Sequence, residues 1–219
     1  MTTPATTSVL DLLARERVLT VVRAPAIPDA AELCRALLAG GISCVELTFT
    51  TPDLLRHLRD AAAVPGCRVG AGTVLTADDA AAAVDAGAEF LVTPGLRPDV
   101  ARVARERDVP FVMGAFTPSE VLTALEWGAA AVKIFPAHAL GPRYLKDLRG
   151  PLPDVRLIPS GGVGPDNAGA FLAHGALAVS AGTDVVPPAS VASGDWADVT
   201  RRARRFTGVL AEAAAPAAT

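Results

Sequence analysis

The stretch "EWGAAAVKIFP", Glu126–Pro136, places a helix end, a glycine and a short apolar strand in direct succession. The same order recurs in "AGGISCVELT" (Ala39–Thr48), "DAGAEFLVTP" (Asp85–Pro94) and "HGALAVSAG" (His174–Gly182). A glycine that ends a helix, followed by a β-branched run, is typical of a helix-to-strand connection in α/β proteins. The repeat length is about 21 to 25 residues, the size of one strand–helix unit.

Eight segments have the short, β-branched-rich composition of strands buried on both faces. They are Val18–Arg23, Ser43–Thr48, Arg68–Thr73, Glu89–Pro94, Pro110–Gly114, Ala130–Pro136, Val155–Gly161 and Leu177–Gly182. Helical patterns alternate with them and begin at Asp29, Thr51–Pro52, Thr76, Arg97–Pro98 and Thr117–Pro118. The sequence therefore predicts an α/β protein with a (β/α)8 TIM barrel. An open doubly wound sheet is the alternative, but no GxGxxG motif follows the first strand.

The chain has 219 residues, of which 51% are hydrophobic, and this is enough for one large core. We expect a single barrel domain over residues 8–211, which begins with a short amphipathic helix, "SVLDLLARER". Residues 1–7 and 212–219 are expected to be disordered tails.

Composition and charge exclude several function classes. The formal net charge is −3, so the chain has no basic excess for nucleic acid. No apolar run reaches the roughly 18 residues of a membrane span, and no basic region precedes an apolar stretch at the start, as in a signal peptide. The three cysteines, Cys34, Cys44 and Cys67, are widely spaced, which favours buried thiols in a cytoplasmic protein over a metal site.

Lys133 lies in the middle of an apolar strand, where an unpaired ammonium is costly. Strand side chains alternate in direction, so Lys133 and Phe135 are expected to face the barrel interior, and Glu46 on the second strand is expected to face Lys133. Desolvation favours the neutral forms of both groups, which suits a nucleophilic amine and a proton carrier. The alternative is a buried ion pair without a catalytic role. Only Lys133 and Lys146 are lysines among the 20 Lys and Arg residues, and a Schiff base requires lysine.

Two glycine-bearing segments follow the last two strands, "PSGGVGPDN" (Pro159–Asn167) and "SAGTD" (Ser180–Asp184). In barrels, the loops after strands 7 and 8 often bind phosphate through backbone N–H groups. Gly161, Gly162 and Gly182 would let the backbone approach an anion, and the Thr183 hydroxyl would add a donor. Tight turns without a ligand are the alternative.

Two further strand ends carry candidate ligand contacts. "GAGTVL" (Gly70–Leu75) offers Thr73 as a hydroxyl donor beside glycines, and "VVRAP" places Arg23 where a guanidinium could bind a carboxylate. A solvated arginine at a strand end is the alternative for Arg23.

Motifs along nearly the whole chain, from about Ser8 to Ala211, resemble the KDPG/KHG aldolases, which are class I pyruvate aldolases. The motifs are "VELTFTTP" with Glu46, "GAGTVL" with Thr73, "VTPG" (Val92–Gly95), "VKIFPA" with Lys133 and "PSGGV" (Pro159–Val163). The resemblance implies a (β/α)8 barrel, a homotrimer, no cofactor or metal, and a role in the Entner–Doudoroff route of carbohydrate metabolism.

The resemblance also implies residue roles. Lys133 would form the Schiff base with the pyruvate part of the substrate, and Glu46 would move protons. Thr73 would help to bind the carboxylate, Phe135 and Pro94 would shape the pocket, and the glycines with Thr183 would bind the phosphate.

The chain departs from the family pattern at two positions. Well-known members carry an arginine where Thr50 stands, and Arg23 is expected to bind the carboxylate in its place. Asp184 puts a carboxylate beside the expected phosphate site, which weakens the case for a phosphorylated substrate.

The expected function is therefore a Schiff-base aldolase that cleaves a 2-keto-3-deoxy sugar acid, with 2-keto-3-deoxy-6-phosphogluconate as first choice. The alternatives are 4-hydroxy-2-oxoglutarate or an unphosphorylated 2-keto-3-deoxy acid as substrate. Two other classes are alternatives: a sugar-phosphate epimerase or decarboxylase, which needs a metal or acid–base aspartates, and a non-catalytic barrel that binds keto acids.

Overall fold

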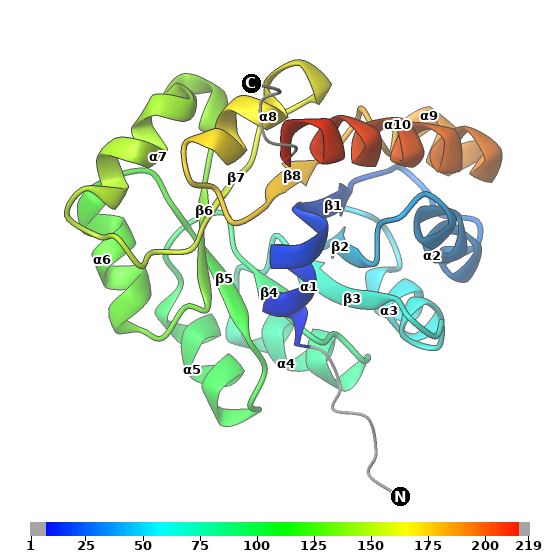
Figure 1. Cartoon of the computed structure of the whole chain (residues 1–219). Helices are drawn as coiled ribbons and strands as arrows, with labels where there is room; N and C mark the ends of the chain where they lie inside the picture. Colours follow the sequence, from blue (N-terminus) through cyan, green and yellow to red (C-terminus); the bar gives the residue numbers. More distant parts are fainter. Residues whose placement is uncertain (1–7, 215–219) are drawn as a thin grey trace, which may run out of the picture.

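The computed structural model describes residues 8–214 (Figure 1). Residues 1–7 and 215–219 of the expected disordered tails lie outside the described residues, and the prediction is wrong for residues 212–214, which are helical. The last helix ends at Ala214, three residues beyond the predicted domain boundary at Ala211.

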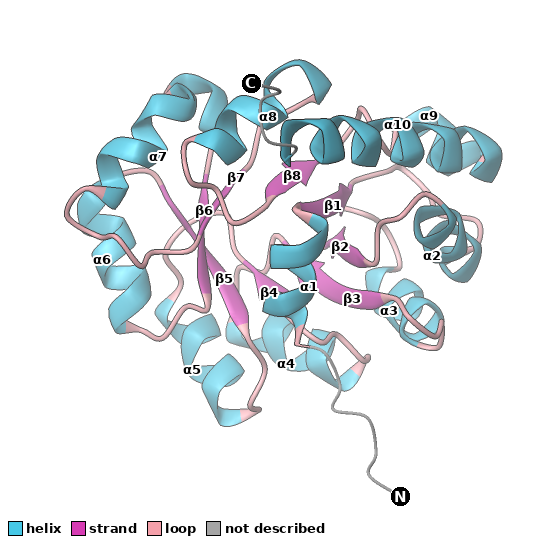
Figure 2. Cartoon of the chain, viewed as in Figure 1, coloured by secondary structure: helices cyan, strands magenta, loops and turns pink. Residues whose placement is uncertain are grey.

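Eight parallel strands form a nearly closed barrel with helices outside it (Figure 2). The strands are β1 (Val18–Val22), β2 (Cys44–Thr48), β3 (Arg68–Gly72), β4 (Leu91–Val92), β5 (Phe111–Ala115), β6 (Ala131–Ile134), β7 (Leu157–Pro159) and β8 (Val179–Ala181). Their order is β7-β6-β5-β4-β3-β2-β1-β8, which confirms the predicted (β/α)8 barrel. Seven of the strands are shorter than predicted, with only two residues in β4, whereas β5 keeps its predicted length and begins one residue later.

The barrel has a seam between β7 and β8. All other neighbouring strands share a ladder, whereas the described residues near this seam form only the isolated bridge between Leu157 and Ala176. Because Leu157 is the first residue of β7 and Ala176 precedes β8, the bridge lies at the N-terminal end of the barrel. The C-terminal ends of β7 and β8 are therefore not joined to each other by a ladder of hydrogen bonds.

The helices are α1 (Val9–Glu16), α2 (Ala30–Ala39), α3 (Leu54–Ala62), α4 (Ala77–Asp85), α5 (Pro98–Glu106), α6 (Pro118–Glu126), the short 3-10 helix η1 (Ala137–Ala139), α7 (Gly141–Arg149), α8 (Pro165–Ala173), α9 (Pro188–Ser193) and α10 (Trp196–Ala214). Side-chain caps explain several of the starts. Asp29, Thr76 and Thr117 each accept a hydrogen bond from the backbone three residues later, as predicted. The start predicted at Thr51–Pro52 is displaced, because α3 begins after Asp53, whose φ is +55°.

Side chains of alternate strand positions fill the barrel interior, and the intervening ones pack outward against the helices. The inner cluster contains Leu19, Cys44, Phe90, Val92, Val112, Ala131, Ile158 and Ala178. Val9, Leu12 and Leu13 of α1 belong to the same cluster. Helix α1 precedes β1 and lies across the barrel in Figure 1, so its apolar face closes the N-terminal end.

The three cysteines are free and buried, as predicted. Cys44 belongs to the inner cluster, and burial raises the pKa of its thiol to about 12. A hydrogen bond with the Cys34 thiol, together with burial, raises the pKa of Cys67. These thiols therefore act as apolar core groups.

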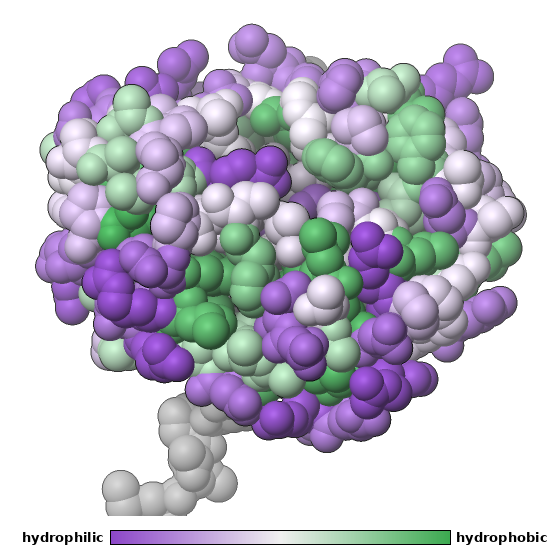
Figure 3. All heavy atoms as spheres, turned by 180° about the vertical axis from the view of Figure 1, so that it is seen from behind, coloured by the Kyte–Doolittle hydropathy of each residue, from purple (hydrophilic) through white to green (hydrophobic). Residues whose placement is uncertain are grey.

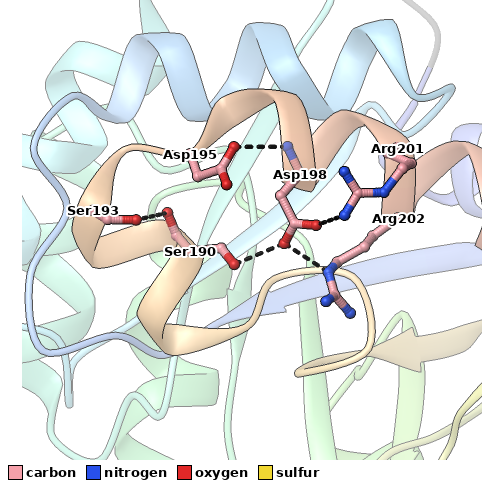
Figure 4. A network of polar contacts seen from close by, with 6 residues as sticks. All are labelled: Ser190, Ser193, Asp195, Asp198, Arg201 and Arg202. Carbon is pink, nitrogen blue, oxygen red and sulfur yellow. Dashed lines mark hydrogen bonds and ion pairs between the residues drawn. The ribbon is translucent and has the colours of Figure 1, made fainter.

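Helix α9 was not predicted, and a buried carboxylate ties it to α10 (Figure 4). The Ser190 hydroxyl donates to Asp198 at 2.7 Å, and Arg202 donates to the same carboxylate oxygen at 2.7 Å. Arg201 pairs with the other oxygen. The Ser190 hydroxyl and the two guanidinium groups lower the pKa of Asp198. The "RRARR" segment of the last helix thus contributes two arginines to a structural cluster.

Candidate active site

Lys133 and Glu46 meet inside the barrel, as predicted. The Lys133 Nζ lies 3.6 Å from Oε1 of Glu46, and their side chains are 9% and 0% exposed. Among residues 8–214, neither carboxylate oxygen of Glu46 has a hydrogen-bond partner. A buried carboxylate with free acceptor sites can take a proton from a substrate hydroxyl, so the pair offers an amine and an acid–base group in one place.

Glycines make the space that this pair occupies. A Cβ on Gly72 of β3 would overlap the Glu46 carboxylate, and a Cβ on Gly70 would overlap the Phe90 ring. Gly70 and Gly72 are therefore the inward-facing positions of β3, and Gly72 is required because Glu46 lies directly against it. Gly114 of β5 is paired in register with Lys133, and a Cβ there would overlap the Pro94 backbone.

A cavity of about 530 Å³ opens beside Lys133. Seven of the predicted site residues line it: Arg23, Lys133, Phe135, Gly161, Gly162, Gly182 and Thr183. The glycine loops after β7 and β8 form one side of the cavity, so it lies at the C-terminal end of the seam, where these two strands do not pair. Figure 3 shows the face opposite α1, whose surface is hollowed near its middle.

The loop after β7 is held in one shape by Asn167. Its amide group donates to the Gly162 carbonyl at 2.8 Å and accepts the Gly164 N–H at 3.0 Å. Gly161 and Gly162 both have positive φ, +86° and +71°, which glycine adopts without strain. A Cβ on Gly162 would lie 2.6 Å from the Cβ of His138. The loop therefore needs glycine at these positions for two reasons: the backbone has positive φ, and a side chain on Gly162 would overlap His138.

Phe135 lies at the rim of the cavity. The prediction that it faces the barrel interior is wrong in this respect, because β6 ends at Ile134 and the Phe135 side chain is 40% exposed. Its ring still contacts the lysine, with Nζ 5.6 Å from the ring centroid. A ring at this position covers the amine on its solvent side.

Four predicted site residues, Glu46, Thr50, Thr73 and Pro94, are not among those that line the cavity. Glu46 lies beneath Lys133, whereas Thr73 follows the end of β3 with φ +55°. The Thr50 hydroxyl lies 2.9 Å from that of Thr48. Arg23 alone of the candidate carboxylate ligands lines the cavity.

Sequence reasoning missed four lining residues, Ser160, Asp166, Asn167 and Ser180. Ser160 and Ser180 are 6% and 4% exposed. Ser180 stands between apolar residues of β8, just as Lys133 does in β6, so the signal of a polar residue in an apolar strand was present. Ser160 directly follows the end of β7. Asp166 and Asn167 belong to the first turn of α8 and carried only the pattern of a helix start.

The described part of the chain contains no group of three or more His, Cys, Asp or Glu side chains that could hold a metal ion. It also contains no helix whose length and hydropathy suit a membrane span.

Comparisons with known proteins identify the family of this chain. The family described as KDPG and KHG aldolase matches residues 9–202. The chain belongs to this family. The 2-dehydro-3-deoxy-phosphogluconate aldolase of Pseudomonas aeruginosa is 39% identical over 94% of this chain and 95% of its own. The KHG/KDPG aldolase of Escherichia coli K12 is 34% identical over 90% of this chain and 94% of its own.

Solved structures of the KDPG and KHG aldolase family have the same fold. The structure described as native KDPGal superposes with a TM-score of 0.83 at 29% identity, over 90% of this chain and 95% of that one. The KDPG aldolase of Legionella pneumophila, with pyruvate captured as a covalent carbinolamine intermediate, has a TM-score of 0.82 at 30% identity over 90% of this chain and 97% of its own.

Proposed function

We propose that the protein is a class I aldolase that cleaves 2-dehydro-3-deoxy-6-phosphogluconate to pyruvate and glyceraldehyde 3-phosphate. The observation that carries the proposal is the buried Lys133–Glu46 pair beside an open cavity. The names of the relatives supply the substrate, and a relative that holds pyruvate as a carbinolamine supports covalent chemistry at a lysine.

In the proposed mechanism the neutral Lys133 amine attacks the C2 keto carbon, and loss of water gives the iminium ion. Glu46 then takes the proton of the C4 hydroxyl, the C3–C4 bond breaks, and its electron pair moves into the iminium to form an enamine. Protonation at C3 and addition of water release pyruvate and restore the amine. Glu46 has free acceptor sites and lies against Lys133, so it can serve each proton step.

The proposed ligand contacts follow the cavity. Arg23 binds the carboxylate of the pyruvate part, in place of the arginine that Thr50 replaces. Gly161, Gly162, Gly182 and Thr183 contribute N–H and hydroxyl donors for the phosphate. Phe135 covers the iminium, and Thr73 and Pro94 support the wall on the β3 and β4 side.

The name of the E. coli relative favours 4-hydroxy-2-oxoglutarate as a second substrate. It shares the 2-keto carboxylate end with the first and would use the same Lys133 and Arg23. We further propose that the protein works in the cytoplasm as a homotrimer in the Entner–Doudoroff route, as the family resemblance implies. Sedimentation of the purified protein tests the trimer.

Trapping with pyruvate tests the Schiff base directly. The protein is incubated with pyruvate, reduced with borohydride and digested for mass spectrometry. The chain's only other lysine, Lys146, is exposed on α7 and is the internal control. We expect the adduct on Lys133 and its loss in Lys133→Arg, while Lys146→Arg retains it. A folded protein without an adduct on Lys133 would refute the proposal.

A further inference from the structure

We propose that Asp184 adapts the distal end of the cavity to a hydroxyl group, so that the enzyme also cleaves the unphosphorylated 2-keto-3-deoxy sugar acid to pyruvate and glyceraldehyde. The inference rests on the proposed aldolase function and concerns the side of the same cavity that the segments after β7 and β8 line. Asp184 is thereby a specificity-determining residue for the known type of reaction.

The charged side chains that line the cavity disfavour a phosphate group. Two carboxylates line the cavity where a phosphate is expected: Asp184 directly follows Gly182 and Thr183, and Asp166 lies in the first turn of α8. The cationic side chains among the described lining residues are Lys133 and Arg23. Lys133 is paired with Glu46, and Arg23 is assigned to the substrate carboxylate. A phosphate dianion at the glycine loops would therefore meet two negative side chains and no cation of its own.

Asp184 lies beside the N-terminus of α8. Its Oδ2 lies 2.9 Å from the point where a Cβ on Gly164 would stand, and Gly164 is the N-cap residue of α8. The N-terminus of a helix is where phosphate binds in many proteins. In this protein a carboxylate of the chain itself is already beside that helix end, so a second anion there is disfavoured.

Few backbone N–H groups in the first turn of α8 are free to bind a ligand. The Gly164 N–H is bound to the Asn167 side chain at 3.0 Å, and Pro165 at the first helical position has no N–H. The Asn167 N–H is directed to the Gly164 carbonyl. Of the first turn, only the Asp166 N–H is left for a ligand among the described hydrogen bonds. The loop glycines still offer donors, so phosphate is accepted but less strongly than at a full helix end.

The neutral polar groups of the cavity suit hydroxyls. Ser180 is one of the residues that line the cavity, and its buried Oγ has no hydrogen-bond partner among residues 8–214. A buried hydroxyl without a partner is unfavourable until a ligand supplies one. A sugar-acid chain supplies hydroxyls that both donate and accept. A terminal hydroxyl can donate to the Asp184 carboxylate, which an ionised phosphate cannot do.

The reaction balances without any further reactant. The Lys133 amine forms the iminium at C2 with loss of one water, the C3–C4 bond breaks as the C4 hydroxyl proton passes to Glu46, and the electron pair enters the enamine. The aldehyde that leaves is glyceraldehyde. Protonation at C3 and return of one water release pyruvate, so no atoms or electrons are gained overall.

The test compares wild type with Asp184→Asn on 2-keto-3-deoxygluconate and its 6-phosphate, with pyruvate release as the measure. We expect wild type to cleave both acids. In Asp184→Asn the ratio of kcat/KM for the phosphorylated over the unphosphorylated acid should rise at least about tenfold, mainly through a lower KM for the phosphate. Asp184 is exposed, so the variant retains the fold, and pyruvate trapping on Lys133 should be unchanged.

Asp154→Asn is the matched control, because Asp154 is also exposed but precedes β7 and is absent from the cavity lining. It should leave the ratio as in wild type. An unchanged ratio in Asp184→Asn, an equal change in Asp154→Asn, or a wild type that cleaves only the phosphorylated acid would overturn the role of Asp184. Absence of the pyruvate adduct in wild type would instead overturn the aldolase function itself.

Discussion

The Nζ of Lys133 lies 3.6 Å from the Oε1 of Glu46, and both groups are buried inside the barrel. The distance is longer than a hydrogen bond, and both Glu46 oxygens lack a hydrogen-bond partner in the described residues. The fold therefore buries two ionisable groups without a hydrogen bond between them. This arrangement lowers the stability of the folded protein, but it leaves both groups available for proton transfer.

Removal of one member of the pair should destabilise the protein more than removal of both. Lys133→Met leaves a buried carboxylate without its partner, and we expect it to lower the free energy of unfolding by about 3 to 5 kcal/mol. Addition of Glu46→Met removes the isolated charge and should recover most of this loss. Urea unfolding at pH 7 measures both; a double variant no more stable than Lys133→Met would contradict the argument.

Gly72 should be essential to activity, because its missing Cβ leaves room for the Glu46 carboxylate. We expect Gly72→Ala to push Glu46 away from Lys133 and to lower kcat by about 10²- to 10⁴-fold, the usual contribution of a general acid–base group. Steady-state kinetics at saturating substrate measure this.

The matched control for Gly72→Ala is Gly208→Ala in α10, where an added Cβ meets nothing within 4 Å. It should leave kcat unchanged and stabilise the helix by about 0.5 to 1 kcal/mol. Wild-type kcat in a folded Gly72→Ala protein would show that Glu46 does not depend on this glycine.

His57 should make stability depend on pH. It is buried on α3, and burial together with Arg56 lowers the pKa of its ring below the usual 6.5. The unfolded chain therefore binds a proton more readily than the folded protein, so stability is complete above about pH 6.5 and is lost as the pH falls through the folded pKa. In His57→Leu, the fall in unfolding free energy between pH 7 and pH 5 should be smaller.

His138 supplies the control for this pH effect, since it is exposed. His138→Asn should keep the wild-type dependence of unfolding free energy on pH. If His57→Leu follows the wild-type curve as well, the buried imidazole is not the group responsible.

Asp198 should stabilise the junction of α9 and α10 that Figure 4 shows. Its lowered pKa means that its contribution is present above the usual value of 3.8 and is lost as the pH falls through the folded pKa. We expect Asp198→Asn to lower stability at pH 7 by about 1 to 3 kcal/mol, with the difference from wild type narrowing below pH 3.8.

Asp147→Asn is the comparison for Asp198, because Asp147 is exposed and its pair with Arg143 spans 3.9 Å. Such exposed pairs contribute at most about 1 kcal/mol. Equal effects of the two substitutions at pH 7 would mean that the α9–α10 cluster adds no more than a surface contact.

The parts of the fold that follow from periodicity were predictable. Alternation along β2 and β6 was enough to place Glu46 and Lys133 on one side of their strands, because strand geometry leaves only two faces. The same rule failed where a strand ends early. β3 ends at Gly72, and Thr73 then adopts φ +55°, so alternation no longer determines its direction.

Other features depend on contacts between distant segments. The seam exists because β7 and β8 do not form a ladder of hydrogen bonds with each other, and no single segment of the sequence determines whether they do. Asp166 of α8 and Ser180 of β8 line the same cavity, although they lie in separate elements of the sequence. Helix α9 has six residues, too few for a helical period to be recognised in sequence, and its link to Asp198 crosses to the next helix.

The apolar face of α1 closes one end of the barrel, and in the described residues the cavity opens at the other end. Val9, Leu12 and Leu13 fill the end opposite the cavity, so substrate enters and both products leave by the same route. For an aldolase of this shape, the aldehyde has to depart past the rim at Phe135 while the three-carbon fragment is still attached to Lys133. The covalent bond to Lys133 would thus set the order in which the products leave, and α1, which touches none of the reacting atoms, would set the end of the barrel through which they leave.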